Sequence, residues 1–112
     1  MKIENTKAQM RKGILELCVL SIISEREAYP SDIIKKLKEF KLIVVEGTLY
    51  PLLSRLKNAS LLGYNWKESK SGPPRKYYKL TEDGQSFLSD LHGTWEELNH
   101  AVSQSTKKFK KS

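Results

Sequence analysis

Polar side chains with several hydrogen-bonding groups recur along one segment of the chain, residues 47–59. Leucines at a helical spacing give this segment one apolar face, and a helical wheel places a second set of residues away from that face. The second set carries hydroxyl, amide and guanidinium groups and one proline: Thr48, Tyr50, Pro51, Ser54, Arg55 and Asn58. Such groups bond to base edges and phosphates. The segment therefore favours a helix that recognises duplex DNA, the alternative being an ordinary exposed surface.

A second cluster of residues could neutralise negative charge. Between residues 67 and 79 a single acid, Glu68, accompanies five basic residues: Lys67, Lys70, Arg75, Lys76 and Lys79. Lysine and arginine that approach a duplex displace counterions from its phosphates, which gives affinity without sequence preference. This cluster is the expected partner of the polar helix.

The residues that would support other chemistry are missing from the sequence. There is no nucleophile paired with a base, no glycine-rich phosphate loop and no carboxylate pair in an apolar setting, which argues against an enzyme. The two histidines and one cysteine lack the spacing of a zinc site, so we expect neither a metal nor a cofactor. Cys18 lies in an apolar run and is expected to be an inert core residue.

Length, charge and hydropathy are typical of one small folded domain. The chain has 112 residues, and its net charge of +7 is unevenly distributed. Residues 31–80 carry 11 basic and 4 acidic residues, whereas residues 81–106 have a net charge of −5. A basic centre suggests a nucleic-acid partner, although a solvated lysine-rich surface has the same composition. No apolar stretch is long enough to span a membrane. The longest apolar run, residues 14–23, is followed by no small-residue cleavage site and is not expected to be a signal peptide, so a cytoplasmic location is expected.

The pattern of apolar residues predicts three helices in the first half of the chain. The first covers Met10–Ser24, and apolar residues cover more than one of its faces. The second begins with Ser31 as its N-cap and ends near Lys41, and a short β-prone run follows at residues 42–45. The third covers residues 47–59, with Thr48 as its cap and Pro51 in its first turn.

Two strands and a long helix are predicted in the second half. Residues 62–67 and 75–80 flank a turn at residues 69–74 and form a β-hairpin. Strand alternation places Tyr64 and Trp66 on one face, directs Tyr78 inward and directs Tyr77 outward. Thr81 caps the last helix, and the basic tail from Lys107 is expected to be frayed.

The last helix carries a narrow apolar seam that favours a helix–helix contact. Its residues follow a heptad pattern: Leu88, Leu91, Trp95, Leu98 and Val102. Together with the apolar first helix, this seam predicts a homodimer. Residues 1–80 are expected to bind DNA, and residues 81–112 to form the dimerisation helix and basic tail of the same compact unit.

The order of elements specifies a fold class. One helix, then a helix-turn-helix over residues 31–59, a basic hairpin and a long helix predict a mainly α (α+β) winged helix-turn-helix. In this fold the second helix of the pair enters the major groove. A different class of function remains open, namely a dimeric adaptor that binds protein through its last helix. Such an adaptor would not bind duplex DNA at physiological salt.

Three stretches of the sequence resemble the PadR family of bacterial transcriptional regulators. They are residues 13–17 with the apolar run that follows, residues 47–56 (GTLYPLLSRL) and residues 72–84 (GPPRKYYKLTEDG). The resemblance covers about residues 8–100. It implies a winged-helix DNA-binding domain, a homodimer built by the C-terminal helix and, usually, repression of transcription. Carried over by position, Gly72, Arg75, Lys76 and Tyr77 would form the wing and its DNA contacts.

Trp95 has two interpretations. It could anchor the dimer, as aromatic residues at interfaces commonly do. It could instead stack on a planar aromatic effector in a pocket between the subunits, since small members of the family include a multidrug-binding repressor with a tryptophan in a similar place. Asp90, Glu96 and Glu97 lie near it in the sequence and would favour a cationic effector.

Overall fold

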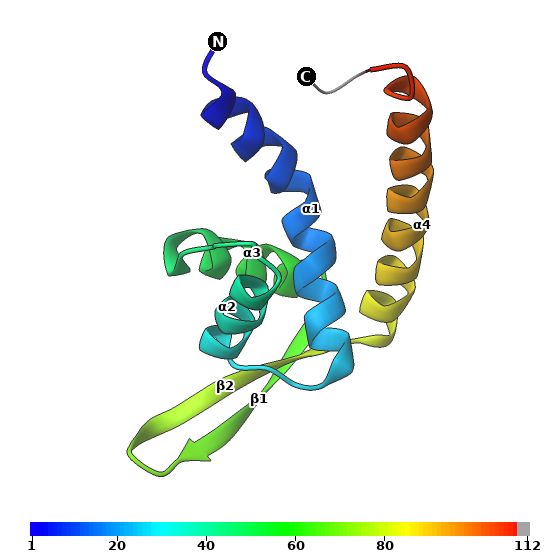
Figure 1. Cartoon of the computed structure of the whole chain (residues 1–112). Coiled ribbons are helices and arrows are strands. Elements are labelled where there is room, and N and C mark those ends of the chain that lie inside the picture. The colour runs from blue at the N-terminus through cyan, green and yellow to red at the C-terminus, as the bar shows by residue number, and fades with distance from the viewer. Residues whose placement is uncertain (110–112) are drawn as a thin grey trace.

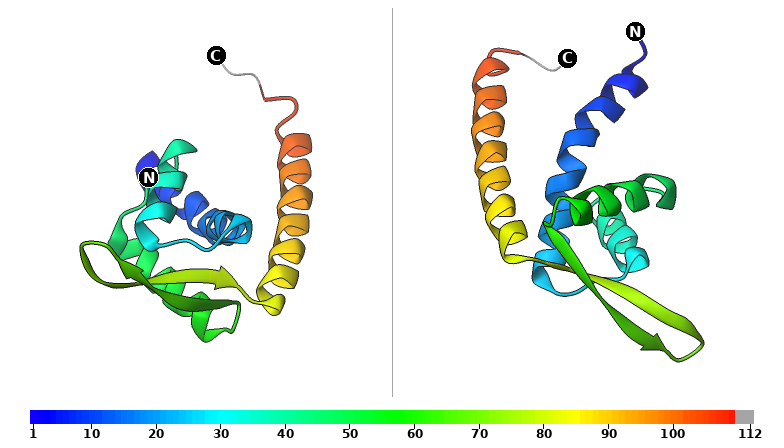
Figure 2. Two further views of the ribbon diagram at one scale, coloured as in Figure 1. Left: turned by 90° about the horizontal axis from the view of Figure 1, so that it is seen from below. Right: turned by 180° about the vertical axis from the view of Figure 1, so that it is seen from behind.

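The structure, a computed structural model, describes residues 1–109 as four helices and one antiparallel β-hairpin (Figure 1). In chain order the elements are α1 (Ile3–Glu25), α2 (Pro30–Glu39), α3 (Glu46–Asn58), β1 (Leu62–Ser69), β2 (Gly72–Leu80) and α4 (Glu82–Ser105). This order confirms the predicted winged helix-turn-helix. The first half of α1 and the second half of α4 extend away from the body formed by α2, α3 and the hairpin, on the same side of it (Figures 1 and 2).

The core joins the C-terminal half of α1 to α2, α3 and the base of the hairpin. Its buried apolar residues are Val19, Leu20, Ile23, Ala28, Ile33, Leu37, Val44, Leu49, Leu52, Leu53, Leu56, Leu62 and Tyr78. The leucines of α3 all belong to it, as the helical wheel predicted. Packing these leucines inward fixes which residues of α3 are presented to solvent.

Helix α1 is longer than the sequence pattern predicted. It begins at Ile3 rather than Met10. Residues 3–9 have no apolar stripe, but they contain no glycine or proline and continue the helix by propensity alone. The first half of α1 is consequently exposed, and Met10 has 68% of its surface accessible.

Two local predictions between α1 and α3 were wrong. Helix α2 begins at Pro30, not after a Ser31 cap, and the Asp32 carboxylate accepts a hydrogen bond from the Tyr29 N–H at 3.1 Å. Residues 42–45 form no strand, because the backbone that pairs with the hairpin is that of Ala28. Its N–H and C=O bond to Tyr78 at 3.0 and 2.8 Å.

Helix α3 begins slightly earlier than predicted. Its N-cap is Val45, whose carbonyl accepts hydrogen bonds from Thr48 and Leu49, so Thr48 is a first-turn residue and not the cap. Pro51 is therefore inside the helix, where it cannot donate to the carbonyl of Gly47. The prediction that Pro51 lies in the first turn was wrong for the same reason.

The hairpin is longer than predicted, and its turn is shorter. The strands pair as far as Ser69 and Gly72, which leaves Lys70 and Ser71 as the turn. The register shifts next to Glu68, where the second strand has one extra residue. Such a bulge accommodates Pro73 and Pro74, which cannot donate to the ladder. The predicted inward direction of Tyr78 is confirmed, since its side chain is 6% exposed.

Helix α4 is anchored to the body by its first turn. The Thr81 hydroxyl caps the helix by accepting from the Gly84 N–H at 2.9 Å, and it donates to the Ser60 carbonyl at 2.7 Å. A Cβ at Gly84 would lie 2.0 Å from the Leu61 carbonyl oxygen, so this close approach requires glycine. The helix ends at Ser105, residues 106–109 follow as a turn, and the rest of the predicted basic tail, 110–112, lies outside the described residues.

In the part of the chain that the structure describes, none of the helices is long and apolar enough to cross a membrane.

Candidate nucleic-acid interface

Helix α3 presents a polar face to solvent beside the hairpin. All six residues predicted from the helical wheel are exposed: Thr48, Tyr50, Pro51, Ser54, Arg55 and Asn58. Partial desolvation raises the pKa of the Tyr50 hydroxyl, and the nearby Glu46 carboxylate adds to the effect. Tyr50 is therefore a neutral O–H group at physiological pH, able to donate a hydrogen bond to a base or a phosphate.

Arg55 has a partner within the protein. Its guanidinium lies 3.7 Å from the Glu16 carboxylate of α1, and the Arg55 side chain is 65% exposed while that of Glu16 is 29% exposed. The contact draws Arg55 toward α1, at the flank of α3.

Three of the five basic residues of the hairpin lie over aromatic rings: Lys67, Arg75 and Lys76. The Arg75 guanidinium lies 4.8 Å from the ring centroid of Tyr29, which also packs against Tyr77 at 5.8 Å. Cations over ring faces are attracted by the ring quadrupole, so these contacts restrict the directions in which the side chains extend. Tyr77, predicted to point outward, is half-buried as a result.

Lys76 lies on the opposite face of the hairpin, within an aromatic cluster. Its ammonium is 4.3 Å from the ring centroid of Tyr64, 5.6 Å from that of Trp66 and 5.9 Å from that of Tyr78. The side chain is half-buried rather than freely solvated. Lys70 and Gly72, by contrast, are exposed at the tip of the hairpin.

Glu27 fixes the first strand of the hairpin to the loop after α1. Its carboxylate accepts a hydrogen bond from the Asn65 amide at 2.6 Å and pairs with the Lys67 ammonium at 3.0 Å. The hydrogen bonds from Lys67 and Asn65 lower the pKa of Glu27, so the carboxylate is charged at neutral pH. The Lys67 ammonium also lies 4.8 Å from the ring centroid of Tyr77, so it contacts both Glu27 and Tyr77.

A groove of about 320 Å³ separates the polar face of α3 from the hairpin. It is lined by Tyr29, Pro30, Tyr50, Ser54, Trp66, Pro74, Arg75, Lys76 and Tyr78. Neither Tyr29 nor Trp66 was expected at the interface from the sequence. For Trp66 the signal was available, because strand alternation already placed this large aromatic ring beside Tyr64. For Tyr29 it was not, because its position depends on the pairing of Ala28 with the hairpin.

The predicted seam of α4 faces the first half of α1 across an apolar hollow. This hollow has a volume of about 360 Å³ and is lined mainly by apolar side chains: Met10, Ile14, Leu17, Leu91, Trp95, Leu98 and Val102, with Gln9, Gly13 and Thr94. Leu88 and Leu91 are half-buried, whereas Trp95, Leu98 and Val102 are 39%, 56% and 58% exposed. The exposed part of the seam is thus its C-terminal end.

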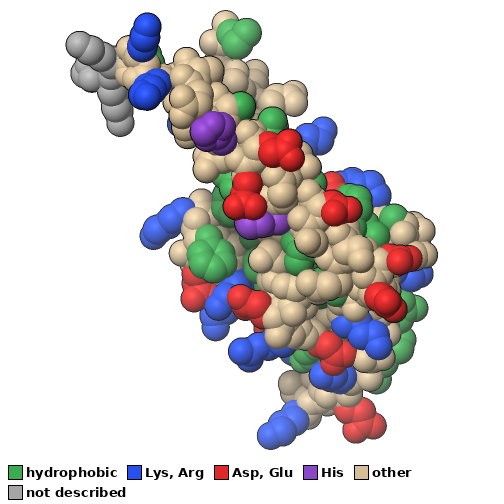
Figure 3. All heavy atoms as spheres, turned by 90° about the vertical axis from the view of Figure 1, so that its right-hand side faces the viewer, with side chains coloured by type: hydrophobic (Ala, Val, Ile, Leu, Met, Phe, Trp, Pro, Cys, Tyr) green, Lys and Arg blue, Asp and Glu red, His purple; other side chains and the backbone are tan. Residues whose placement is uncertain are grey.

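Trp95 also borders a second hollow, of about 480 Å³, which extends past Leu88 and His92 to Phe40. The acids that were expected to surround Trp95 do not line either hollow. Glu96 instead lies 3.6 Å from His92, and acidic side chains are spread over the α4 side of the molecule (Figure 3). Glu25 is the acid that lines the second hollow.

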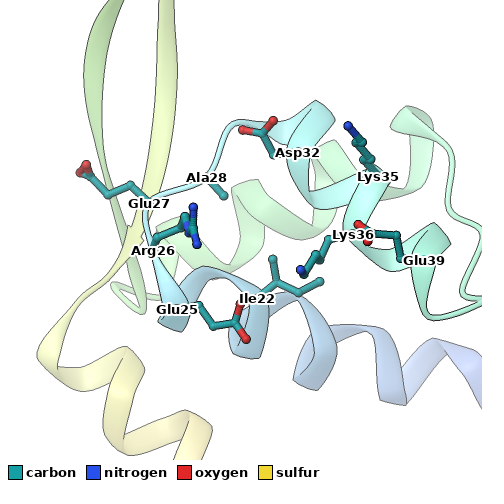
Figure 4. A pocket seen from close by; sticks show the side chains of 9 residues that line it. All are labelled: Ile22, Glu25, Arg26, Glu27, Ala28, Asp32, Lys35, Lys36 and Glu39. Carbon is teal, nitrogen blue, oxygen red and sulfur yellow. The ribbon is translucent and has the colours of Figure 1, made fainter.

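A further hollow of about 390 Å³ lies between the end of α1 and α2 (Figure 4). Acidic and basic side chains alternate around it, among them Glu25, Arg26, Lys35 and Glu39. Mixed charges of this kind favour no single class of charged ligand.

Among residues 1–109 the structure contains no cluster of His, Cys, Asp and Glu that could hold a metal ion. Burial raises the pKa of the Cys18 thiol, which makes it less reactive.

Comparison with known proteins identifies relatives along most of the chain. Residues 19–90 match the Transcriptional regulator PadR-like family. The solved structure of a PadR-like transcription factor from Bacteroides fragilis is 62% identical, with a TM-score of 0.75, and the match covers 89% of this chain and 97% of that one.

Two further solved structures are similar. A PadR-like transcriptional regulator from Bacillus cereus is 38% identical with a TM-score of 0.77, over 86% of this chain and 94% of that one. A PadR family transcriptional regulator from Eggerthella lenta is 31% identical with a TM-score of 0.85, over 95% of this chain and 93% of that one. The members of this family are regulators of transcription and not enzymes. The winged helix-turn-helix with its exposed polar α3 and basic hairpin thus belongs to a DNA-binding transcriptional regulator of the PadR-like family.

Proposed function

We propose that the protein is a repressor that binds an inverted-repeat operator as a homodimer, with α3 in the major groove and the hairpin along the backbone. The observation that carries this proposal is the exposed polar face of α3 beside a hairpin with five basic residues and one acid. Thr48, Ser54 and Asn58 supply groups that recognise base edges. Lys70, Arg75 and Lys76 supply charge for phosphates.

The proposed dimer uses the apolar surface shared by α1 and α4. A contiguous apolar surface is exposed on α4 at Trp95, Leu98 and Val102. Met10 of α1 lines the same hollow as these three residues. A second copy related by a two-fold axis would cover both surfaces at once. In this arrangement residues 1–80 contain the DNA-binding elements, and residues 81–112, together with the exposed half of α1, hold the two copies together.

An inverted repeat follows from the two-fold symmetry of the dimer. Two α3 helices presented on one side of such a dimer would enter successive major grooves, about 10 base pairs apart or at a multiple of that spacing. Repression is proposed from the likeness to the PadR family, and a bacterial cytoplasmic location goes with it.

The proposed effector is a planar aromatic molecule that stacks on Trp95. Trp95 and Leu17 line both apolar hollows, so the indole is accessible from two sides in one protomer. Glu25 lines one of these hollows and would favour a cationic ligand there. The competing role for Trp95 is packing against the second copy.

A selection experiment tests the proposed function. The protein would be mixed with a pool of random duplexes, and the bound fraction would be amplified and sequenced over several rounds. We expect enrichment of an inverted repeat whose binding weakens as salt increases. If the protein is instead an adaptor that binds protein through α4, no duplex will be retained at physiological salt, and the proposal will be wrong.

A further inference from the structure

The hairpin face turned toward α3 carries an exposed tryptophan that the proposed function does not yet use. Trp66 pairs with Lys76 across the hairpin, and Tyr64 pairs with Tyr78, so these four side chains share one face. The indole is 62% exposed. It meets the Tyr64 ring edge-on, with centroids 6.1 Å apart and planes at 88°. This contact orients the indole while leaving much of its surface open.

The groove beside Trp66 has walls of different chemistry. One wall is the polar face of α3, represented by Tyr50 and Ser54. The other wall is the hairpin, where Trp66 and Lys76 lie on the face turned toward α3. Arg75 lines the groove from the next position of the strand, with its guanidinium stacked on Tyr29. None of the described residues that line this groove is acidic, so an anionic partner would meet no like charge within it.

The Trp66 indole and the Lys76 ammonium, side by side on the hairpin, match the chemistry of a nucleic-acid strand. The backbone of DNA alternates an apolar deoxyribose surface with a charged phosphate. The Lys76 ammonium lies 5.6 Å from the ring centroid of Trp66, beside the indole. An ammonium over a ring still has N–H groups directed away from it, which can donate to a phosphate oxygen.

We propose that this groove holds one sugar–phosphate strand of the duplex, with Trp66 packed against a deoxyribose and Lys76 bonded to the neighbouring phosphate. The inference rests on the proposed DNA binding and specifies which part of the duplex lies between α3 and the hairpin. Both contacts are independent of base sequence. Trp66 therefore adds affinity for every duplex, whereas recognition of bases stays with α3.

Substitution of Trp66 tests the proposal through the salt dependence of binding. The probe is a fluorescein-labelled duplex of 24 base pairs and mixed sequence, followed by anisotropy at several KCl concentrations. Trp66→Ala should weaken binding about tenfold, as truncation of a central aromatic residue does at other interfaces. It should leave the salt slope unchanged because no charge is removed. Lys76→Gln should instead lower the slope by about one.

Two further variants serve as controls. Phe87→Ala removes an aromatic side chain that is 38% exposed on α4, outside the groove, and should leave binding unchanged. Trp66→Phe should restore much of the affinity, because phenylalanine retains an apolar ring. Circular dichroism on each variant confirms that the fold is intact. Equal binding by wild type and a folded Trp66→Ala variant would overturn the inference.

Fluorine NMR gives a second readout on the wild-type protein. The chain has two tryptophans, so incorporation of 5-fluorotryptophan gives two resonances, and Trp66→Phe assigns one of them. The Trp66 resonance should shift when the mixed-sequence duplex is added. A resonance that stays in place at saturating duplex would contradict the inference and leave the proposed function standing. Failure of the wild-type protein to bind any duplex would contradict the proposed function itself.

Discussion

At the scale of single residues, the candidate DNA interface contains two kinds of side chain. Some are exposed without a contact that orients them, and others are oriented by neighbouring residues. Ser54 and Asn58 are exposed on α3. Arg75 and Lys76 are stacked on aromatic rings, and Arg55 is paired with Glu16. Side chains positioned in advance lose less conformational entropy when they bind. The hairpin is therefore suited to give affinity, and the exposed groups of α3 to give sequence preference.

Arg75 should contribute a phosphate contact. Arg75→Ala removes one positive charge, so the slope of log affinity against log salt should become shallower by about one unit, and binding should weaken for all duplexes alike. Arg75→Lys is the matched control, because it keeps the charge while changing the stacking on Tyr29. Titration of the selected operator and of an unrelated duplex at four salt concentrations measures both quantities. An unchanged slope in Arg75→Ala would remove this residue from the interface.

Substitution of Trp95 distinguishes between two roles for this residue, binding an effector and packing in the dimer. If the indole binds planar cations, wild type should bind a flat cationic dye at micromolar concentration, equivalent to about 8 kcal/mol, and Trp95→Ala should lose this binding. A flat anionic dye is the matched probe and should bind more weakly, because Glu25 lines the adjoining hollow. Calorimetric titration measures both dyes. Binding of neither dye by wild type would assign Trp95 to packing alone.

The exposed face of α3 could be predicted from the sequence, but the contacts of its residues could not. Helical periodicity determines which side chains oppose the buried leucines, and all six predicted residues are exposed. The pairing of Arg55 with Glu16 joins residues 39 positions apart, so it depends on how α1 crosses α3. The contact of Arg75 with Tyr29 likewise depends on tertiary packing.

At the scale of elements, the sequence predicts helices and strands well where apolar residues are periodic. It predicts them poorly where an element has no apolar face or depends on tertiary pairing. Periodicity indicated α2, α3, α4 and both strands. It missed the first turns of α1, which have no apolar face, and the pairing of Ala28 with Tyr78, which requires the hairpin to be in place. The β-prone run at residues 42–45 has high strand propensity but no neighbouring strand to pair with.

The junction between the hairpin and α4 should depend on Gly84. Gly84→Ala places a methyl group against the Leu61 carbonyl, which forces the backbone apart and should cost about 3 kcal/mol of folding free energy. The melting temperature should fall by roughly 10 °C. Gly93→Ala is the matched control, since nothing lies within 4 Å of its added Cβ, and it should be neutral or stabilising. Equal melting temperatures for the two variants would mean that the close approach at Gly84 is not tight.

At the scale of the whole molecule, the long axis and the apolar surface of α1 and α4 determine the expected assembly. The molecule measures 54 Å along its longest axis and 21 Å along its shortest. The ends of α1 and α4 extend away from the hairpin and α3 (Figure 1). Contact between two copies through these ends would leave both α3 helices free to bind DNA.

Dimerisation should depend on the exposed end of the α4 seam. Leu98 is 56% exposed in one protomer, so Leu98→Glu should fold normally but place a charge in the dimer contact. Sedimentation velocity at micromolar concentration should show a dimer for wild type and a species of 12.9 kDa for the variant. Asn99→Glu adds the same charge at an exposed position outside the seam and should remain dimeric. A wild-type protein that sediments only as a monomer would contradict the proposed assembly.

A hydroxyl-radical footprint on the selected operator shows in one experiment whether the protein binds DNA and with what symmetry. A dimer with one α3 helix in each half-site should protect two segments related by a two-fold axis, with half-site centres about 10 base pairs apart or at a multiple of that distance. The same experiment with Leu98→Glu should lose both segments together at concentrations that saturate wild type. A single asymmetric protected segment, or uniform protection of any duplex, would contradict the account.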